Sequence, residues 1–540
     1  MSKSVTRRGF MLGAGAVSAA TILTSKRGFS LELAGVSIDA SKETGLIRPE
    51  LHGQFAEHLG SCVYGGLWVG KDSPVPNING YRRQAVEYLK GLVPVLRWPG
   101  GCFADDYHWR DGVGPAARRP KTVNISWGNN IEDNSFGTNE FIGLCRLIGA
   151  EPYLSANVGS GTPEEMRDWM EYCNYPKGSS LSDLRAANGA AEPFHVKYWG
   201  VGNENWGCGG QMTGDEYATQ FRRFSNYARA FGEARPFLVA CGPSGNNQEW
   251  TRKFWGNMAG SRRGFPQGFA MHFYSNGGNV STKFTPAEME KQFSSFVEIE
   301  KAIVEQRALL DTYDPQKQVS LLLDEWGVWD RMVPEEQTRY GRLFQQITMR
   351  SAVAAALGLN VIHRQAGRLA MSNIAQIVNV LHSMLLADGA QCVRTTTYYV
   401  YEMTKAHLSQ TSIAAAVEKP EPVGLSVSAS RKGGELTLTL VNPKPDAGMT
   451  VNCSLEGASA RSATARILHD ADLNAANTFA TPDRIVPRDH KVAVEGARIV
   501  IDLPPLSVVT ALVKLALGRG TPRPGRAAQR APRGPYSVLE

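Results

Sequence analysis

The chain has 540 residues, of which 42% are hydrophobic and 20% are charged, a composition typical of a globular protein with more than one domain. The net charge of +7 is concentrated at the ends, because residues 1–27 carry +5 and residues 518–540 carry +4. The body between them carries −2, so the sequence argues against a phosphate-binding surface and no nucleic-acid partner is expected.

The first 27 residues resemble a twin-arginine export signal. Arg7 and Arg8 precede a mildly apolar run that extends to Leu23. The alternative is a short membrane anchor, but Gly13, Gly15 and several small residues make the run too short and too weakly apolar to span a bilayer. The segment therefore predicts an exported protein, periplasmic or extracellular, with no membrane partner.

Beyond residue 46, short apolar runs alternate with longer helical patterns, which is typical of βα units around a parallel sheet. Eight such runs predict an α/β protein with a (β/α)8 TIM barrel. The predicted strands are 51–57, 93–97, 152–157, 196–203, 237–242, 269–274, 319–325 and 369–374. Amphipathic patterns predict helices over 163–173, 214–231, 286–310 and 337–357.

From about residue 410, short alternating strands separated by turn residues predict an additional antiparallel β-sandwich domain, completed by an N-terminal strand near residues 31–38. Its expected strands are 425–429, 435–441, 450–455, 491–494, 497–503 and 507–515. The predicted division of the chain is therefore a signal peptide (1–27), a catalytic barrel (46–409), a sandwich (28–45 and 410–517) and a disordered basic tail (518–540).

Two of the apolar runs end in a carboxylate. One leads into Gly202, Asn203 and Glu204, and another leads into Glu325. Parallel barrels carry their active sites at the carboxyl ends of the strands, where these two side chains would meet. The alternative for Asn203 and Glu204 is a strand-terminal turn with a solvated charge.

A pair of carboxylates on buried strands matches glycoside hydrolysis, in which one is protonated to assist the leaving oxygen and the other is ionised to attack the sugar carbon. Flat aromatic rings near them would suit the apolar faces of sugar rings. The tryptophans in these stretches are Trp199, Trp206, Trp326 and Trp329.

Other polar residues follow the predicted strands and are expected at the same mouth. Singly, each has a structural alternative: Arg97 could anchor a glycine loop, His272 could be a hydrogen-bonded core histidine, and Gln376 could cap a helix. Their coincidence at successive strand ends favours a common site. The full set is Glu57, His58, Arg97, Asn157, Asn203, Glu204, His272, Tyr274, Glu325 and Gln376.

Cysteine usage gives no metal-binding pattern, because the eight cysteines include no C-x-x-C pair. Most are interpreted as small buried hydrophobic residues, and the sequence alone does not pair them. The eight are Cys62, Cys102, Cys145, Cys173, Cys208, Cys241, Cys392 and Cys453. No metal and no cofactor are expected.

At the residues that carry these motifs, the chain resembles the α-L-arabinofuranosidases of glycoside hydrolase family 51. The resemblance extends in family order over nearly the whole chain between the two terminal segments. The matching stretches are GQFAEHLGSCVYGGLW (53–68), RWPGGCFADDYHWRDGVGP (97–115), KYWGVGNENWGCGG (197–210), HFYS (272–275), DEWGVW (324–329), AQIVNVL (375–381) and LPPLSVVTALV (503–513).

The resemblance implies a retaining barrel hydrolase that releases terminal α-L-arabinofuranosyl groups from arabinan, arabinoxylan or derived oligosaccharides by double displacement. Arabinose-containing plant polysaccharides or oligosaccharides would be its partners, and a homo-oligomer is left open. The alternative on the same scaffold is an endo-β-1,4-glucanase or xylanase. A sugar-binding protein without activity would have no need of both carboxylates, and both are present.

Carried over by motif, the resemblance implies that Glu204 is the general acid/base and Glu325 the nucleophile. It further implies that Asn203 bonds the sugar 2-hydroxyl and that Arg97 and Tyr274 orient the nucleophile.

The same resemblance implies outer sugar contacts for Glu57 and Gln376, and a bond from His272 near the acid/base. Two positions depart from the family pattern. Cys102 stands where some members have an asparagine that bonds the sugar, and Gly327 stands where DEWN is common.

Overall fold

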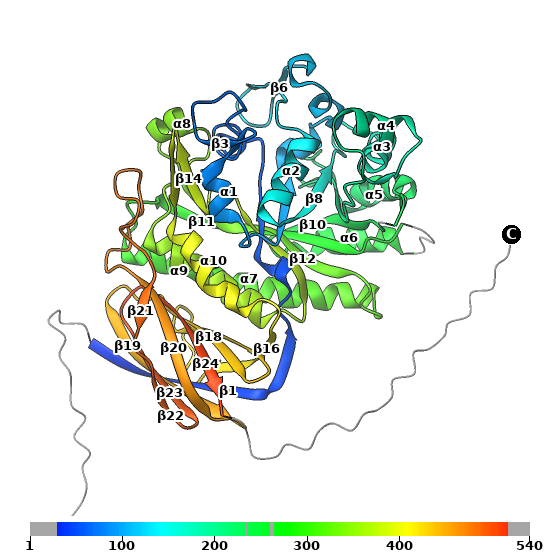
Figure 1. Cartoon of the computed structure of the whole chain (residues 1–540). Coiled ribbons are helices and arrows are strands. Elements are labelled where there is room, and N and C mark those ends of the chain that lie inside the picture. Colours follow the sequence, from blue (N-terminus) through cyan, green and yellow to red (C-terminus); the bar gives the residue numbers. More distant parts are fainter. Residues whose placement is uncertain (1–29, 234, 260–263, 517–540) are drawn as a thin grey trace, which may run out of the picture.

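The computed structural model describes residues 30–233, 235–259 and 264–516, and places a closed barrel beside a large sheet (Figure 1). Eight parallel strands close the barrel in the order β10-β11-β12-β13-β2-β5-β8-β9. Their bounds are β2 (Gly53–Phe55), β5 (Val95–Trp98), β8 (Glu151–Ala156), β9 (Tyr198–Val201), β10 (Phe237–Ser244), β11 (Gly268–Val280), β12 (Ser320–Arg331) and β13 (Leu369–Ala375). Each predicted barrel run overlaps one of these strands, so the TIM-barrel prediction is confirmed.

The barrel interior is packed with side chains and is not a pore. Seven of the eight strands contribute buried residues to one interior cluster, which aromatic and branched side chains dominate. The cluster consists of Val95, Tyr153, Tyr198, Val239, Ala270, Leu322 and Met371.

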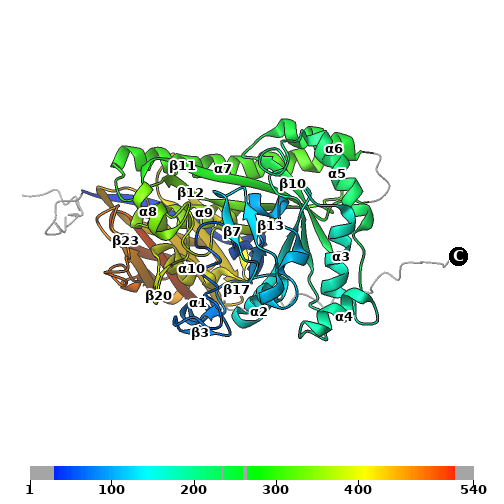
Figure 2. The ribbon, with the colours of Figure 1, turned by 90° about the horizontal axis from the view of Figure 1, so that it is seen from above.

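The helices begin where the sequence provides caps. α3 and α7 start at the predicted Pro163 and Pro286, and each is preceded by a threonine whose hydroxyl accepts a backbone N–H of the first turn. The α-helices are α1 (Arg83–Leu89), α2 (Thr138–Ile148), α3 (Pro163–Asn174), α4 (Ser180–Ala187), α5 (Gly214–Tyr227), α6 (Gln248–Met258), α7 (Pro286–Tyr313), α8 (Pro334–Tyr340), α9 (Met349–Arg364) and α10 (Thr396–Thr404). In the view from above, α3 to α6 lie at the end of the molecule away from β20 and β23 (Figure 2).

The single helix predicted over 337–357 is wrong, because this stretch holds two helices. Gly341 ends α8 with a φ of 100°, a conformation that glycine adopts without a steric penalty. Thr348 then starts α9 with a capping box that includes Ser351.

Short elements decorate the loops. The 3-10 helices are η1 (Pro49–His52), η2 (Cys102–Asp105), η3 (Trp109–Gly112), η4 (Ala116–Arg118) and η5 (Lys405–His407). Three two-stranded ribbons pair β3 (Asn77–Ile78) with β4 (Tyr81–Arg82), β6 (Thr122–Asn124) with β7 (Asn130–Glu132), and β14 (Leu385–Asp388) with β15 (Gln391–Arg394).

The second domain is a ten-stranded sheet in the order β21-β20-β24-β18-β17-β16-β1-β19-β23-β22. It folds over its own apolar core, since β20 contacts β22 from near the opposite end of the order. The strands are β1 (Ser30–Leu46), β16 (Thr411–Val417), β17 (Ser426–Lys432), β18 (Glu435–Asn442), β19 (Ala447–Glu456), β20 (Ala460–His469), β21 (Arg488–His490), β22 (Ala493–Glu495), β23 (Arg498–Leu503) and β24 (Ser507–Leu515).

This sheet confirms the additional β domain, with two differences from the prediction. β1 pairs antiparallel with β16 but parallel with β19, where Val36 lies opposite Cys453. Three strands, β16, β20 and β21, were also not predicted from the sequence. We propose the domain division 46–409 and 28–45 with 410–517 on this basis, while the predicted signal and basic tail lie outside the described residues.

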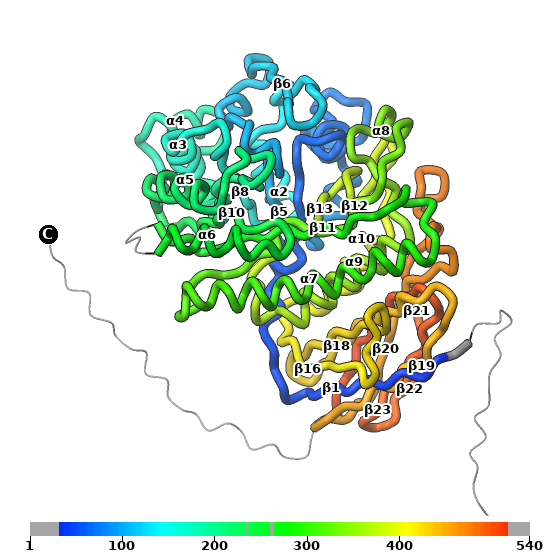
Figure 3. Tube along the Cα trace, turned by 180° about the vertical axis from the view of Figure 1, so that it is seen from behind, coloured from blue at the N-terminus to red at the C-terminus, as the bar shows by residue number. Residues whose placement is uncertain are grey.

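The two domains meet along α7 and α9. In views from opposite sides, α7 lies between the barrel and the sheet (Figures 1 and 3). α9 contacts β12 on the barrel side and β17 and β18 on the sheet side, and is buried from Met349 to His363. Because both sides of this helix are covered, the domains share one continuous interface.

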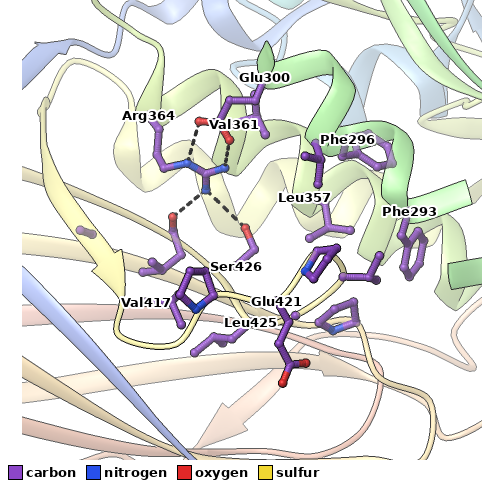
Figure 4. A pocket seen from close by; sticks show the side chains of 18 residues that line it. Phe293, Phe296, Glu300, Leu357, Val361, Arg364, Val417, Glu421, Leu425 and Ser426 are labelled. Atoms are coloured by element: carbon purple, nitrogen blue, oxygen red, sulfur yellow. Dashed lines mark hydrogen bonds and ion pairs between the residues drawn. The ribbon is translucent and has the colours of Figure 1, made fainter. Parts of the chain in front are cut away.

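Arg364, at the end of α9, makes a polar anchor in this interface. Its guanidinium pairs with Glu300 of α7 and donates to Ser426 Oγ and to the Val427 carbonyl (Figure 4). The same residues border a cavity of about 250 Å³, whose apolar wall includes Phe293 and Phe296.

Three histidines are buried at the same junction: His52 of η1, His363 of α9 and His407 of η5. His52 Nε2 lies 2.8 Å from His363 Nε2, and the rings of His363 and His407 are 4.5 Å apart between centroids. Burial lowers the pKa of His52 and His407 to about 3 and lowers the pKa of His363 well below its usual value. These imidazoles are therefore neutral in the folded protein at neutral pH.

Candidate active site

Glu325, on β12, is held by two hydrogen bonds from neighbouring strand ends. Arg97 Nη1 donates to Oε1 at 2.7 Å, and the Tyr274 hydroxyl donates to Oε2 at 2.7 Å. Burial by itself would raise the pKa of this carboxyl, but the charges of His272 and Arg97 and the bonds from Arg97 and Tyr274 outweigh it and lower the pKa. Glu325 is therefore an ionised carboxylate in a site that leaves 5% of its side chain exposed.

Glu204 follows β9 with a φ of 42°, and its carbonyl accepts the backbone N–H groups of Gly207 and Gly209. His272 Nδ1 lies 2.9 Å from Glu204 Oε1, and 18% of the Glu204 side chain is exposed. Carboxylate oxygens of Glu204 and Glu325 and a ring nitrogen of His272 all lie within 4.8 Å of one another. The two strand-end carboxylates therefore meet, as the sequence predicts.

His272 lies between the two carboxylates. Its Nδ1 is 3.6 Å from Glu325 Oε2 in addition to its contact with Glu204. Burial opposes a charged imidazole, but the negative charges of Glu325 and Glu204 and the bond to Glu204 outweigh burial and raise the pKa of His272. A positive His272 would in turn favour the ionised form of Glu325.

Arg97 contacts three polar side chains of the site. Besides Glu325, its guanidinium donates to Asn203 Oδ1, and its Nε lies 3.5 Å from Asp324 Oδ2. Asn203 is 2% exposed, and its Nδ2 has no hydrogen-bond partner among the described residues. Buried amide donors are rarely left unpaired, so this N–H group is available to a ligand.

Glu57 accepts three hydrogen bonds at the end of β2, from Phe103 N, Trp127 Nε1 and Gln376 Nε2. Burial, helped by the charge of Glu325, outweighs these bonds and raises the pKa of Glu57 to about 7. Gln376 Oε1 is buried and has no partner in the described part of the chain. This side of the site thus offers both a carboxyl and a free amide oxygen.

A glycine loop after β5 allows these carboxylates to approach one another. A Cβ on Gly101 would lie 3.3 Å from both Glu325 Oε1 and Glu57 Oε2, and one on Gly100 would lie 2.5 Å from Glu57 Cγ. A side chain at position 101 would therefore crowd both acids, and one at position 100 would crowd Glu57. Gly327, the second departure from the family pattern, has a φ of 147°, and a Cβ there would lie 3.0 Å from His382 Cβ.

Cys102 and Cys208 form a disulfide between the loops that follow β5 and β9. Cys208 Sγ lies 3.7 Å from Glu204 Oε2, and Cys208 is exposed. The sulfur at position 102 is thus covalently bonded and offers no donor where some family members have an asparagine. The other six cysteines are buried free thiols.

Two residues expected at the mouth do not reach it. His58 is 2% exposed and bonds Glu132 and Trp98, while Asn157 bonds its own loop at Ser160 and Gly161. Both follow predicted strands, but their side chains turn into the protein.

Two of the four tryptophans proposed as sugar platforms are also corrected. Trp199 and Trp326 are 0% exposed and belong to the main core, whereas Trp206 and Trp329 keep partial exposure. Trp329 packs edge-to-face against Tyr274.

Asp105, which was not among the predicted site residues, is 4% exposed and bonds the backbone of the loop that carries Asn203. Its Oδ1 accepts Val158 N at 2.7 Å and Gly159 N at 2.9 Å, and its Oδ2 accepts Asn203 N at 2.7 Å. Burial outweighs these bonds and raises the pKa of Asp105 to about 7.

Two other partners were also missed: Trp127, which bonds Glu57, and Asp324, which accepts Tyr153 and Asn373. No strand-end position pointed to Asp105 or Trp127, because Asp105 lies in η2 and Trp127 lies in the turn between β6 and β7. Asp324 was overlooked beside the more prominent Glu325.

Two family models match the chain, an α-L-arabinofuranosidase 1 domain over residues 88–292 and an α-L-arabinofuranosidase C-terminal domain over residues 324–507. A protein of Bacteroides ovatus, named intracellular exo-α-L-arabinofuranosidase, is 41% identical over 92% of this chain and 98% of its own length. A probable α-L-arabinofuranosidase C of Aspergillus fumigatus is 32% identical over 79% of this chain and 88% of its own.

Solved structures agree with these relatives. The GH51 arabinofuranosidase of Xanthomonas axonopodis pv. citri is 38% identical, with a TM-score of 0.86 over 89% of this chain and all of its own. The α-L-arabinofuranosidase of Thermotoga maritima, solved as an arabinose complex, is 28% identical with a TM-score of 0.79 over the same shares. The alternative of an endo-β-1,4-glucanase or xylanase is not favoured by these relatives.

The prediction of an exported enzyme is wrong by the same comparison, because the Bacteroides ovatus relative is named an intracellular enzyme. A pair of arginines before a short apolar run is a local pattern with few specified positions, and residues 1–27 lie outside the described residues. In the ranges that are described, none of the helices combines the length and apolarity that crossing a membrane requires.

The family models, the relatives and the solved structures thus agree on the family. The structure agrees with them, because two carboxylates, a histidine and an arginine converge at the strand ends of the barrel. The chain belongs to glycoside hydrolase family 51 and is an α-L-arabinofuranosidase.

Proposed function

We propose that the enzyme works by retaining double displacement, with Glu325 as nucleophile and Glu204 as general acid/base. The observation that carries this proposal is the approach of their carboxylate oxygens to within 4.8 Å. Retaining glycosidases hold their carboxyl groups roughly 5 to 5.5 Å apart, whereas inverting ones leave room for a water molecule between them.

The environments of the two acids support different roles. Glu325 is buried, and its lowered pKa keeps it ionised for attack on the anomeric carbon. In the first step the bond from Glu325 to the sugar forms while Glu204 protonates the departing oxygen. In the second step Glu204 takes a proton from water, which displaces Glu325.

The sugar would be held by the unpaired polar atoms around the two acids. Asn203 Nδ2 is a buried donor beside Glu204 and suits the 2-hydroxyl, and Gln376 Oε1 and Glu57 suit the outer hydroxyls. Arg97, Tyr274 and His272 would orient the carboxylates through the bonds described above. Cys102 would border the sugar through its disulfide sulfur.

The role assignment is tested with an aryl α-L-arabinofuranoside. Glu325→Ala should lose several orders of magnitude in turnover because the covalent step is removed. Glu204→Ala should release a burst of phenol and then stall, since hydrolysis of the intermediate needs a base. Glu290→Ala, at an exposed position on α7, is the matched control and should retain activity.

Rescue by azide then distinguishes the roles of the two acids through the stereochemistry of the product. It should rescue Glu204→Ala with an arabinosyl azide of retained α configuration, and any rescue of Glu325→Ala should give the inverted β product. Exchange of these two outcomes would reverse the roles. The mechanism would be wrong if neither variant lost more than about tenfold, because acid/base catalysis alone typically contributes about 10² to 10⁴.

We also infer that the natural substrates are arabinan, arabinoxylan or oligosaccharides derived from them. The names of the relatives support a terminal arabinofuranosyl substrate. Product analysis should find arabinose released from arabinan and from arabinoxylan, and no oligosaccharides released from β-glucan. The Glu325→Ala variant is the inactive control. A homo-oligomer stays a prediction, to be measured by light scattering.

A further inference from the structure

We propose that the Cys102–Cys208 disulfide masks a metal site: in the reduced enzyme, the two cysteine thiolates and the Glu204 carboxylate bind a zinc ion, which stops the reaction. The loss of activity rests on the proposed role of Glu204, but the binding of zinc does not. Such a site would make the activity depend on both thiol redox state and zinc.

The three ligand atoms already lie close together. One atom from each of Cys102, Glu204 and Cys208 lies within 4.8 Å of the other two, and Cys208 Sγ is 3.7 Å from Glu204 Oε2. Ligand atoms around a tetrahedral zinc are separated by roughly 3.3 to 3.8 Å, given Zn–S and Zn–O distances of about 2.3 and 2.1 Å. Breaking the S–S bond lets the two sulfurs move apart toward this spacing, and water can take the fourth position.

The two loops are fixed by contacts other than the disulfide. Phe103 N, next to Cys102, donates to Glu57, and Asn205 Nδ2 donates to the Gly209 carbonyl at 2.7 Å. The Glu204 carbonyl also accepts Gly207 N and Gly209 N, on either side of Cys208. Both cysteines should therefore stay near Glu204 after reduction, which leaves a partly preorganised set of ligands.

The chemistry requires a two-electron reductant, here a trialkylphosphine. The phosphine attacks one sulfur, the S–S bond breaks, two thiols form with protons from water, and the phosphine becomes its oxide. Zinc then displaces the thiol protons, since thiolate is the form that binds metal. In the disulfide neither sulfur carries a thiolate charge, so the oxidised enzyme lacks two of the three ligands.

Reduction changes only Cys102 and Cys208, because the other six cysteines are already thiols, and zinc binding should be confined to the same pair. Cys208 is exposed, and the other six cysteines are buried thiols. Burial raises the pKa of Cys62, Cys392 and Cys453 to about 12, so these thiols are poor metal ligands while the protein is folded. Counting thiols in the unfolded chain before and after phosphine treatment should give six and then eight.

Binding is measured first, on the full-length enzyme without substrate. After phosphine treatment and anaerobic desalting, equilibrium dialysis should find one zinc bound per chain, and Co²⁺ should produce a thiolate-to-cobalt charge-transfer band. The oxidised enzyme should show neither. Absence of this band in the reduced enzyme would overturn the proposal.

Activity measurements on the reduced enzyme and on cysteine variants test which side chains bind the zinc. Zinc should lower the turnover of the reduced enzyme by roughly 100-fold or more, the contribution typical of an acid/base group, and a chelator should restore it. The variant with both Cys102→Ser and Cys208→Ser should lose this zinc response relative to its own zinc-free activity. Cys453→Ser, in the core of the second domain, is the matched control and should keep the response.

Two other outcomes would contradict parts of the proposal. Equal inhibition of the oxidised enzyme or of the double serine variant would put the metal on Glu204, His272 and Glu325 and would contradict the proposal. Stoichiometric binding through the thiolates with no loss of activity would keep the metal site but refute the inhibition, and would count against Glu204 as the acid/base.

Discussion

At the scale of single residues, a buried carboxylate whose partners are backbone N–H groups holds loops of the site together. Asp105 joins the loops after β5, β8 and β9 by accepting the backbone N–H groups of Val158, Gly159 and Asn203. Because Asn203 directly precedes Glu204, the position of Glu204, the proposed acid/base, depends on this acceptor. We therefore predict that Asp105 is a positioning residue.

Replacing Asp105 with asparagine should lower kcat more than it raises KM. The amide keeps one acceptor but turns an NH₂ group toward backbone donors, so the Asn203–Glu204 loop must shift. A misplacement of about 1 Å can cost on the order of 100-fold in rate. Steady-state kinetics on an aryl arabinofuranoside would measure the effect.

Asp106→Asn is the control for this prediction, because Asp106 is the adjacent half-buried carboxylate and is not a partner of the Asn203 loop. Equal effects of the two substitutions, or an Asp105→Asn enzyme that loses only thermal stability, would show that Asp105 does not position the acid/base.

At the scale of elements, β12 is tied to its surroundings by a buried ion pair. Asp330, five residues beyond Glu325, pairs with Arg350 of α9, and both side chains are 0% exposed. Arg350 also donates to Gln292 of α7 and lies over the Phe284 ring at 3.9 Å. One guanidinium thus connects β12, the strand that carries the proposed nucleophile, to two helices at the domain interface.

Arg350→Ala should destabilise the protein strongly, because it leaves Asp330 buried without a cation. Removing one member of a buried pair typically costs about 3 to 5 kcal/mol. Arg339→Ala breaks the exposed pair with Asp388 and should cost about 0 to 1 kcal/mol. Thermal unfolding of both variants would compare them, and similar Tm values would contradict the buried-pair argument.

Elements with a strong apolar pattern were predictable from the sequence. All eight barrel strands were found because buried parallel strands are nearly continuous apolar runs. β20 was missed because its sequence, ARSATARILH, alternates small and polar residues. The break between α8 and α9 was missed because a helical pattern continues across Gly341.

The site was predictable to the extent that its residues follow strands. Glu204, Glu325, Arg97, Tyr274 and His272 come together because parallel strand ends share one edge of the barrel. Local sequence does not specify which way a strand-end side chain turns, hence the errors at His58 and Asn157. Nor does it show which loops meet, which is why Asp105 and the Cys102–Cys208 pair required the structure.

At the scale of the whole molecule, the three neutral histidines at the domain junction couple stability to pH. Their pKa values lie far below 6.5 in the folded protein and return to about 6.5 in the unfolded chain. Below pH 6.5 the unfolded state therefore binds more protons, so the free energy of unfolding decreases as the pH falls from 6.5 toward 3.

At about pH 5.5 each such histidine should lower the free energy of unfolding by about 1.4 kcal/mol. In His363→Gln, the decrease in Tm between about pH 7.5 and pH 5.5 should be smaller than in the wild type. His195→Asn, at an exposed position, should leave the decrease unchanged.

The comparison between variants is needed because other buried groups act in the opposite direction. The raised pKa values of His272, Glu57 and Asp105 mean that these groups favour the folded state as the pH falls. The same pH dependence in His363→Gln and the wild type would exclude the histidine cluster as a cause.

The position of β1 has a consequence for the synthesis of the protein. β1 is made first among the described strands, yet its partners β16 and β19 follow roughly 380 to 420 residues later. At typical translation rates of about 5 to 20 residues per second, β1 emerges from the ribosome roughly 20 to 80 seconds before both of its partners exist. During that interval the barrel can form while β1 has unpaired edges on both sides, and unpaired strand edges favour pairing with other chains and aggregation.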